Sequence, residues 1–335
     1  MSSRDEQVRT AGGRPAALLA VRISPSDVGR RVTVRHRIDG SQLTDVVGVL
    51  RSWADGVLRV ERRTGEVVAV AARDVVAAKV VTPELSATAM QRVAQAGWPP
   101  FETASLGEWE LRASGGLTGR ANSVRVVGDP GVPLEDALAH VSAWYAERSL
   151  PAILQLPEPS LWDDDLERLG WTPARRTTLR TVPTADLVAA CGPVPDGVGA
   201  ELSADPSPEL LALVEPSLDP EGLARILAAP AERVFVALRG TDGGLLAAGR
   251  ASTASSPAGR WAGVTSVAVA EHARRRGLGT AVMGELGRWA AAVGAPSTYL
   301  QVMAANEPAI ALYARLGLVL HHTYVYRSPG PISSR

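Results

Sequence analysis

The sequence predicts an α/β protein with a small β-domain in front of it. Residues 28–81 contain short β-branched runs between turn signals, which is the pattern of closely spaced strands. Beyond them, strand-like and helix-like segments alternate, and the same order occurs twice, on either side of a stretch rich in Pro, Gly and Asp. Because this alternation is typical of helices layered on a sheet, the larger part of the chain is expected to form α/β layers.

Composition limits the classes of function. Of 335 residues, 46% are hydrophobic, which is enough apolar material for two or three cores. Lys plus Arg and Asp plus Glu number 35 each, so no net charge draws the chain to nucleic acid or to a membrane. Without a signal peptide or an apolar run near the ~20 residues of a membrane span, we expect a cytoplasmic protein. A single cysteine, Cys191, and five histidines without ligand spacing predict no metal; the oligomeric state stays open.

The first 82 residues divide into two segments. Residues 1–20 are small and polar without periodicity, so a disordered tail is expected there. Strands are expected at Arg31–His36, Thr44–Ser52, Val57–Arg62 and Val67–Ala71, with turns at Asp39-Gly40, Asp55-Gly56 and Thr64-Gly65. The rhythm of these strands resembles SH3-like barrels, which places a small barrel at residues 21–82.

This segment is locally basic, and two interpretations of its charge are open. Binding of RNA or of an acidic protein is one of them. However, alternation places most of the arginines on the solvated face of strands, and Trp53 is the only aromatic residue of this segment. We therefore favour the interpretation that the segment does not bind nucleic acid. The basic residues are Arg30, Arg31, Arg35, His36, Arg37, Arg59, Arg62 and Arg63.

An internal repeat organises the rest of the chain into residues 97–185, a linker at 186–199, and residues 200–328. Ser123 and Gln155 are 32 positions apart, against 35 between Ser266 and Gln301, and duplication explains this agreement. The first copy is expected to contain a strand from Ser123, a helix at Leu134–Arg148, a strand at Ala152–Leu156, a helix at Leu161–Leu169 and a strand at Arg175–Val182. The second is expected to contain a strand at Val264–Ala270, a helix at Gly277–Val293, a strand at Thr298–Met303, a helix ending at Leu316 and a strand ending at Arg327.

Only the second copy shows further elements upstream of these. Helices are expected at Pro208–Leu213 and Glu221–Ala228, and strands at Arg233–Leu238 and Leu245–Thr253. The first copy is therefore predicted to be a half-domain.

The strongest functional signal is a loop of arginines and glycines between an apolar strand and an amphipathic helix. Unpaired amides and the positive dipole at a helix start attract anions, glycines let a diphosphate approach them, and arginines neutralise its charge. This setting predicts a pyrophosphate site rather than a surface turn. Its residues are Arg274, Arg275, Arg276, Gly277, Leu278, Gly279 and Thr280.

The loop resembles the signature of the GNAT superfamily of acetyl-coenzyme A-dependent N-acetyltransferases, at Arg274, Gly277 and Gly279. The resemblance continues downstream in an Asn, a Tyr and a Gly followed by an apolar residue, which are Asn306, Tyr313, Gly317 and Leu318. It implies a GNAT fold over residues 200–328 that uses acetyl-coenzyme A. It also implies that the backbone of Val267, Ala268 and Val269 contacts the pantetheine arm of the cofactor, and that Asn306 adjoins the cofactor.

By the same resemblance, the reaction is aminolysis of a thioester by a primary amine of a small molecule, protein or peptide. The amide near Val269 would polarise the thioester carbonyl, and the Tyr313 hydroxyl would protonate the departing sulfur. From the residues alone, Tyr313 is equally a core aromatic residue and Asn306 equally a helix N-cap. A non-catalytic module that senses acetyl-coenzyme A or binds a partner is the alternative function.

The sequence does not identify a general base. The strand Ala262–Val269, where some GNAT enzymes carry a glutamate, has no carboxylate. Glu215, His322 and Tyr326 could act through water, although each is more readily interpreted as structural.

The first copy is not expected to bind coenzyme A, because Gly128–Pro133 replaces the cofactor loop with an aspartate and no arginine. Residues 117–123 before it resemble a segment of actinobacterial tandem GNAT proteins, in which a degenerate first copy packs beside an active second one. Arg120 and Asn122 there either help to shape the acceptor pocket or order the entry to a strand.

Overall fold

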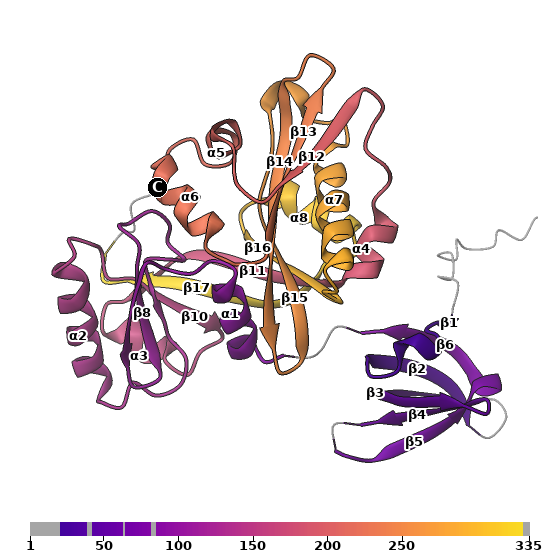
Figure 1. Cartoon of the computed structure of the whole chain (residues 1–335). Coiled ribbons are helices and arrows are strands. Elements are labelled where there is room, and N and C mark those ends of the chain that lie inside the picture. The colour runs from indigo at the N-terminus through magenta and orange to yellow at the C-terminus, as the bar shows by residue number, and fades with distance from the viewer. Residues whose placement is uncertain (1–20, 39–41, 63, 82–84, 331–335) are drawn as a thin grey trace, which may run out of the picture. The chain divides into compact units, whose positions relative to one another are not determined.

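The computed structural model describes residues 21–38, 42–62, 64–81 and 85–330, and the predicted tail at 1–20 lies outside them. The chain forms two compact units, Met1–Val81 and Thr82–Arg335 (Figure 1). Each has its own hydrophobic core.

The smaller unit is a six-stranded sheet with the strand order β1-β6-β2-β3-β4-β5. Its core consists of side chains that alternate along the strands, such as Val32 and Val34 in β2, which are fully buried. The predicted turn at Asp55-Gly56 is present, since both residues have positive φ angles, as a two-residue hairpin requires. The strands are β1 (Val21–Arg22), β2 (Arg31–Ile38), β3 (Gln42–Ala54), β4 (Val57–Glu61), β5 (Val67–Ala71) and β6 (Val75–Val80).

The larger unit contains one sheet of eleven strands, to which both copies of the repeat contribute. Its strand order is β12-β13-β14-β15-β16-β11-β17-β10-β9-β8-β7. The first copy provides α1 (Ala87–Ala96), β7 (Glu102–Leu106), β8 (Trp109–Ala113), β9 (Val124–Arg125), α2 (Leu134–Ala146), β10 (Leu154–Glu158), α3 (Asp163–Arg168) and β11 (Thr172–Pro183). The second copy provides β12 (Val198–Ser203), α5 (Pro208–Val214), α6 (Pro220–Ala228), β13 (Arg233–Gly240), β14 (Leu245–Ser256), β15 (Gly259–Val269), α7 (Leu278–Ala292), β16 (Ser297–Met303), α8 (Glu307–Arg315) and β17 (Val319–Ser328).

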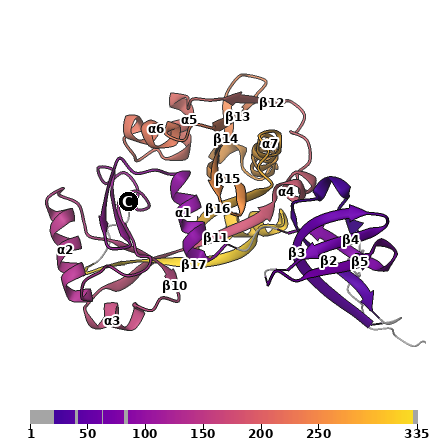
Figure 2. The same cartoon turned by 60° about the horizontal axis from the view of Figure 1, so that its bottom comes forward.

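The prediction that the first copy lacks upstream elements is wrong. Helix α1 and strands β7 and β8 precede β9. Helix α1 begins at the Ser86 hydroxyl, which accepts a hydrogen bond from the Ala89 amide, and it buries Met90, Val93 and Ala94. These three side chains pack against Leu179 of β11 and against strands of the second copy, so α1 joins the two copies (Figure 2).

The expectation of an irregular linker at 186–199 also needs correction at both ends. Residues 186–190 belong to α4 (Thr184–Ala190), and β12 begins at Val198. Helix α4 packs on α7, where Leu187 reaches the backbone of Gly287. Composition alone suggested a linker because Cys191–Gly199 carries the Pro and Gly that end α4.

The last strands of the two copies are exchanged within the sheet. Strand β11 of the first copy lies between β16 and β17 of the second, and β17 in turn pairs with β10 of the first. The pairing of β11 with β16 runs from Thr177 opposite Met303 to Pro183 opposite Ser297. Neither copy therefore has a sheet of its own.

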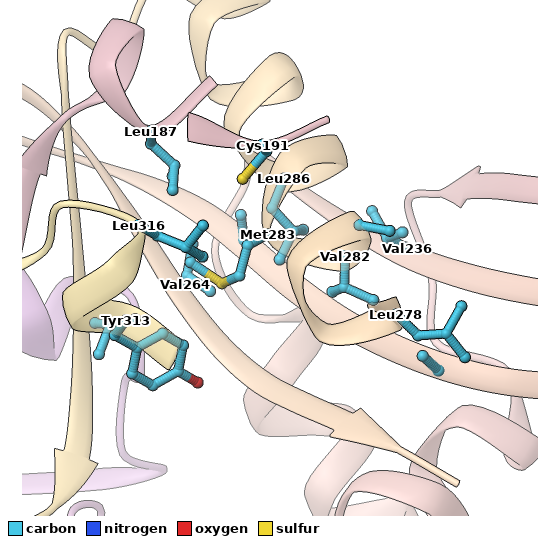
Figure 3. Close-up of a cluster of buried hydrophobic side chains, with 14 of the residues drawn as sticks. Leu187, Cys191, Val236, Val264, Leu278, Val282, Met283, Leu286, Tyr313 and Leu316 are labelled. Atoms are coloured by element: carbon cyan, nitrogen blue, oxygen red, sulfur yellow. The ribbon is translucent and has the colours of Figure 1, made fainter. Parts of the chain in front are cut away.

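Helices cover both faces of the second-copy strands. Helices α4, α7 and α8 lie on one side and α5 and α6 on the other, while α2 and α3 accompany the first-copy strands (Figures 1 and 2). The main core lies between α7 and the sheet, where Val282, Met283 and Leu286 are fully buried (Figure 3). Tyr313 of α8 lies at the edge of this cluster.

Candidate active site

The candidate site begins where β15 separates from its parallel neighbour β16. The two strands pair only from Trp261 opposite Ser297 to Val264 opposite Leu300, although β15 continues to Val269. Beyond Val264, β15 pairs with β14 alone, which leaves one edge of its backbone without a strand partner. The predicted contact strand Val267–Val269 is this freed segment, in which the residues are half-buried.

A β-bulge turns the freed segment of β15. Ser266 and Val267 stand opposite a single residue of β14, Gly249, and Ser266 has a φ of 56°. Gly249 allows α7 to approach closely, because a Cβ there would lie 2.5 Å from Cγ1 of Val282. The close approach of Gly249 and Val282 thus fixes the position of the bulge relative to the first half of α7.

The arginine-glycine loop leads from the end of β15 into α7. Gly277 is the N-cap residue of α7 with a left-handed φ of 77°, and an added Cβ would meet open space. In the described part of the chain, no side chain caps this helix, so the amides of its first turn are available to a ligand. Arg274, Arg275 and Arg276 are exposed and have no ion-pair partner among the described residues. This is the geometry of an anion site at a helix start.

Two further predicted residues lie on α8. The Asn306 side chain caps the helix by accepting a hydrogen bond from the Ala309 amide over 3.2 Å, as an N-cap does. Tyr313 is buried in the main core, in the same cluster as Val264, the residue at the fork where β15 and β16 separate. Burial raises the pKa of Tyr313 to about 12, so its hydroxyl keeps its proton at neutral pH.

A cleft of about 330 Å³ opens on the other side of the fork. Residues of both copies line the cleft, so the first copy contributes to it. The first-copy residues are Trp98, Leu117, Thr118, Gly119, Arg120, Arg175 and Thr177. The second-copy residues are Glu215, Ser217, Leu218, Thr265, Ser266, Gln301, Met303, Tyr324 and Tyr326.

The structure separates the roles of Arg120 and Asn122. Asn122 orders the loop, since its Oδ1 accepts hydrogen bonds from the amides of Ser114 and Gly116 and its Nδ2 donates to the Thr118 carbonyl. Arg120 instead lines the cleft and lies over the Trp98 ring.

The three residues considered as general bases have different surroundings. Glu215 is the only carboxylate among the residues that line the cleft; burial of its carboxyl group raises its pKa, which Arg120 partly opposes. Tyr326 also lines the cleft, but burial raises its pKa far above neutrality. His322 bonds to Gln91, and burial lowers its pKa to about 4. Of the three, Glu215 alone combines a basic group with access to the cleft.

Sequence reasoning missed most of the cleft. Arg175, Thr177 and Gln301 come from strands that meet only because β11 is inserted between β16 and β17. Gln301 accepts a hydrogen bond from the Tyr324 hydroxyl over 2.5 Å. In the sequence, the one feature that pointed to Gln301 was its alignment with Gln155 in the repeat.

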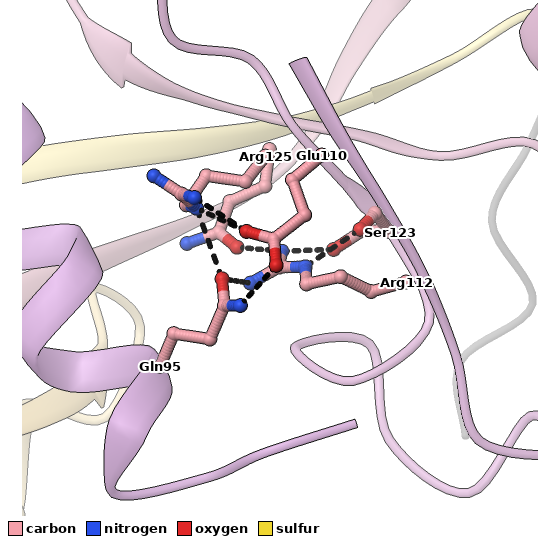
Figure 4. Close-up of polar contacts among 6 residues, drawn as sticks. Gln95, Glu110, Arg112, Ser123 and Arg125 are labelled. Atoms are coloured by element: carbon pink, nitrogen blue, oxygen red, sulfur yellow. Dashed lines mark hydrogen bonds and ion pairs between the residues drawn. The ribbon is translucent and has the colours of Figure 1, made fainter. Parts of the chain in front are cut away.

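In the first copy, polar side chains form a hydrogen-bonded network of their own (Figure 4). Arg112 is fully buried and donates to the carbonyl and hydroxyl oxygens of Ser123 and to Gln155. Arg125 pairs with Glu110, and Gln95 bonds to both Arg125 and Glu110. The network buries Ser123 and Gln155, whose counterparts in the repeat, Ser266 and Gln301, line the cleft.

The small β-domain neutralises several of its arginines internally. Arg35 pairs with Asp45 at 2.8 Å and Arg51 with Glu61 at 2.5 Å. Arg30 and Arg62 pair with Asp27 and Glu66, and Arg63 lies outside the described residues. These pairs weaken the case for a nucleic-acid surface.

Two features are absent from the described residues. They contain no group of three or more His, Cys, Asp or Glu residues placed to hold a metal ion. Within the same residues, no helix has both the length and the apolar character needed to cross a membrane.

Comparison with known families agrees with this geometry. The family described as "Probable histone acetyltransferase Rv0428c C-terminal" matches residues 86–327, the whole of the large sheet. The chain belongs to the Rv0428c family. A second family, described as "Rv0428c N-terminal Sm-like domain", matches residues 26–79, which lie in the smaller unit. The predicted SH3-like fold of that unit is thus confirmed and given a more specific class.

Two individual relatives have names that refer to acetyltransferases. The chain is 36% identical over 148 residues to "Probable histone acetyltransferase Rv0428c" of Mycobacterium tuberculosis, which is 41% of this chain and 46% of that protein, so it spans about half of that relative. It is 27% identical to "Uncharacterized N-acetyltransferase YobR" of Bacillus subtilis over 70% of this chain and 96% of that protein.

Solved structures confirm the GNAT fold. A GCN5-related N-acetyltransferase from Kribbella flavida is similar with a TM-score of 0.57 and 21% identity, over 73% of this chain and 96% of that one. A tandem GNAT protein from the clavulanic acid biosynthesis pathway has a TM-score of 0.50 at 16% identity, over 72% of this chain and 88% of that one. The larger unit therefore has a GNAT fold, and it is similar over most of its length to a tandem GNAT protein.

Proposed function

We propose that this chain transfers an acetyl group from acetyl-coenzyme A to a primary amine. Residues 200–328 would carry the reaction, and residues 97–185 would complete the acceptor site. The observation that carries the proposal is the fork between β15 and β16, which has an anion-binding helix start on one side and a polar cleft on the other.

The cofactor would be held by the loop and by the freed strand edge. First-turn amides of α7 and the exposed Arg274–Arg276 suit a pyrophosphate, and the backbone of Val267–Val269 suits the amide-rich pantetheine arm. Gly279 keeps the helix close to its neighbours, since a Cβ there would lie 3.2 Å from Leu312. These residues fit acetyl-coenzyme A, which supplies the activated thioester when bound.

The chain's own groups would then promote aminolysis. Backbone amides at the bulge would polarise the thioester carbonyl. Glu215 would accept a proton from the ammonium group of the acceptor, directly or through water, so that the free amine attacks the thioester carbonyl; its raised pKa brings Glu215 nearer to the working range of a base. The protonated Tyr313 hydroxyl would supply a proton to the departing thiolate.

A titration with acetyl-coenzyme A by calorimetry tests the proposal. We expect binding by the native chain and loss of at least about tenfold in affinity in Gly277→Asp, because a negative charge then faces the phosphates. Gly294→Asp is the matched control, since Gly294 also has a positive φ and open space but lies at the other end of α7. Equal affinity in Gly277→Asp would contradict the assigned site.

Release of coenzyme A thiol in the presence of amines tests the reaction itself. Binding of the cofactor without turnover of any amine would favour the alternative of a non-catalytic sensor of acetyl-coenzyme A.

A further inference from the structure

Two arginines, Arg120 and Arg175, line the cleft without a salt bridge. In the part of the chain that the structure describes, neither side chain forms an ion pair or a hydrogen bond, and the charge of Arg120 acts on Glu215 only at longer range. Their Nε atoms are buried and have no hydrogen-bond partner. Because an unpaired charge next to protein is costly, such a pair of guanidinium groups is suited to a ligand that brings the missing acceptors.

Both guanidinium groups are held in place by aromatic rings. The Arg120 guanidinium carbon lies 4.9 Å from the Trp98 ring centroid, and that of Arg175 lies 5.2 Å from the Tyr326 centroid. Gly119 adds to this, since a Cβ there would lie only 2.7 Å from Nη2 of Arg175. Stacked arginines lose little further freedom on binding, so these donors are preorganised.

The charge of the cleft is therefore positive next to the fork. Glu215 carries the one negative charge among the lining residues, against the two arginines. Hydroxyl groups of Thr118, Thr177 and Ser217 add polar contacts. The volume of about 330 Å³ lies at the small end of ligand sites, so it suits a small molecule or one residue of a larger one.

We propose that the acceptor is a small primary amine that also carries an oxyanion, either a carboxylate or a phosphate, bound by Arg120 and Arg175. This inference rests on the proposed acetyl transfer. The amine would face Glu215 and the bulge, and the anionic end would face the two arginines. A lysine side chain in a strongly basic peptide is disfavoured, because the same arginines repel its neighbouring charges.

Matched pairs of acceptors test the charge requirement. Initial rates are measured for 4-aminobutyrate and 5-aminovalerate, for their carboxamides, for 3-aminopropyl phosphate and for a lysine-rich basic peptide. We expect kcat/KM for at least one oxyanionic amine to exceed that for its neutral counterpart by at least about tenfold. The carboxylate and phosphate arms identify which oxyanion is preferred.

Substitution of the arginines tests the assignment. Arg175→Met and Arg120→Met should raise KM for the preferred oxyanionic amine by at least about tenfold and leave that for its neutral counterpart within about twofold. Arg176→Met is the matched control, because Arg176 is the next residue of β11 but is exposed and pairs with Glu158. Cofactor affinity measured on every variant reports whether the fold is intact.

The outcomes separate this inference from the proposed function. No binding of acetyl-coenzyme A by the native chain would contradict the proposed function. Turnover of neutral amines or of the basic peptide at rates equal to the oxyanionic amines would contradict the oxyanion proposal alone. If no amine is turned over, 4-aminobutyrate and its carboxamide are each titrated into the complex with acetyl-coenzyme A. Tighter binding of 4-aminobutyrate supports the oxyanion proposal, and equal affinities contradict it.

Discussion

The guanidinium group of Arg112 donates to the carbonyl oxygen of Ser123 over 2.8 Å and to its hydroxyl oxygen over 2.9 Å. Ser123 corresponds in the repeat to Ser266, which lies at the bulge and lines the open cleft. The same position thus receives an internal arginine in the first copy and faces the cleft in the second. The first copy therefore differs from the second in a buried network as well as in its missing loop.

Arg112→Met should destabilise the larger unit by about 3–5 kcal/mol, because Ser123 and Gln155 lose their buried donor. Urea unfolding measures the change. Arg92→Met, an exposed position on α1, should stay within about 0.5 kcal/mol of the native chain. Equal stability of the two variants would show that the network contributes little.

Gly249→Ala should destabilise the chain by about 1–3 kcal/mol, because the new Cβ would overlap Val282 and Leu286 of α7. Displacement of α7 should also weaken the binding of acetyl-coenzyme A. Gly199→Ala is the control, since nothing lies within 4 Å of a Cβ there. Unfolding curves and cofactor titrations on both variants provide the comparison, and native stability in Gly249→Ala would refute the close packing.

Tyr313→Phe should lower kcat by at least about tenfold and leave the affinity for acetyl-coenzyme A within about twofold, because only the hydroxyl is removed. Tyr145→Phe, which removes a buried hydroxyl from the first copy, should reduce stability without a comparable loss of kcat. Should Tyr313→Phe lower stability alone, its role is that of a core aromatic residue.

Glu215→Gln should lower kcat/KM for the acceptor by about a hundredfold if Glu215 is the base. The pKa of Glu215 is raised, so its carboxylate is lost as pH falls through a range above that of an ordinary glutamate. The native rate should fall with it, and the variant should lack this part of the pH profile when the same amine is used. Glu209→Gln on α5, which removes a surface partner of Arg239, should keep the native profile.

Much of the second copy could be predicted because its signals are local. The helix start at Gly277 follows from a glycine and arginines directly after an apolar strand, and α7 begins at the next residue. Helix α1 was missed although Ser86 and Gly97 bound it, because Gln91 and Gln95 interrupt its apolar face. Gln91 accepts a buried hydrogen bond from Gln155, and Gln95 forms a partly buried one with Glu110, which periodicity cannot reveal.

The exchange of β11 and β17 could not be predicted for a different reason. Both strands follow a short helix that ends near a glycine, at Gly170 and Gly317, so each pattern fits either neighbour. The choice depends on contacts between residues far apart in the sequence. Since Arg175 reaches the cleft only through this choice, local patterns could not predict how the first copy contributes to the cleft.

The exchanged strands also set an order on biosynthesis. Strand β17 fills the place between β10 and β11, yet it is made after the other ten strands of this sheet. Until residues 319–328 emerge, edges of β10 and β11 from the first copy remain without their neighbour, so the large sheet cannot be completed before then. The six-stranded unit faces no such delay, because all its strands lie before residue 81. A nascent chain can thus complete its small domain early, while the cleft forms only after residues 319–328 have been made.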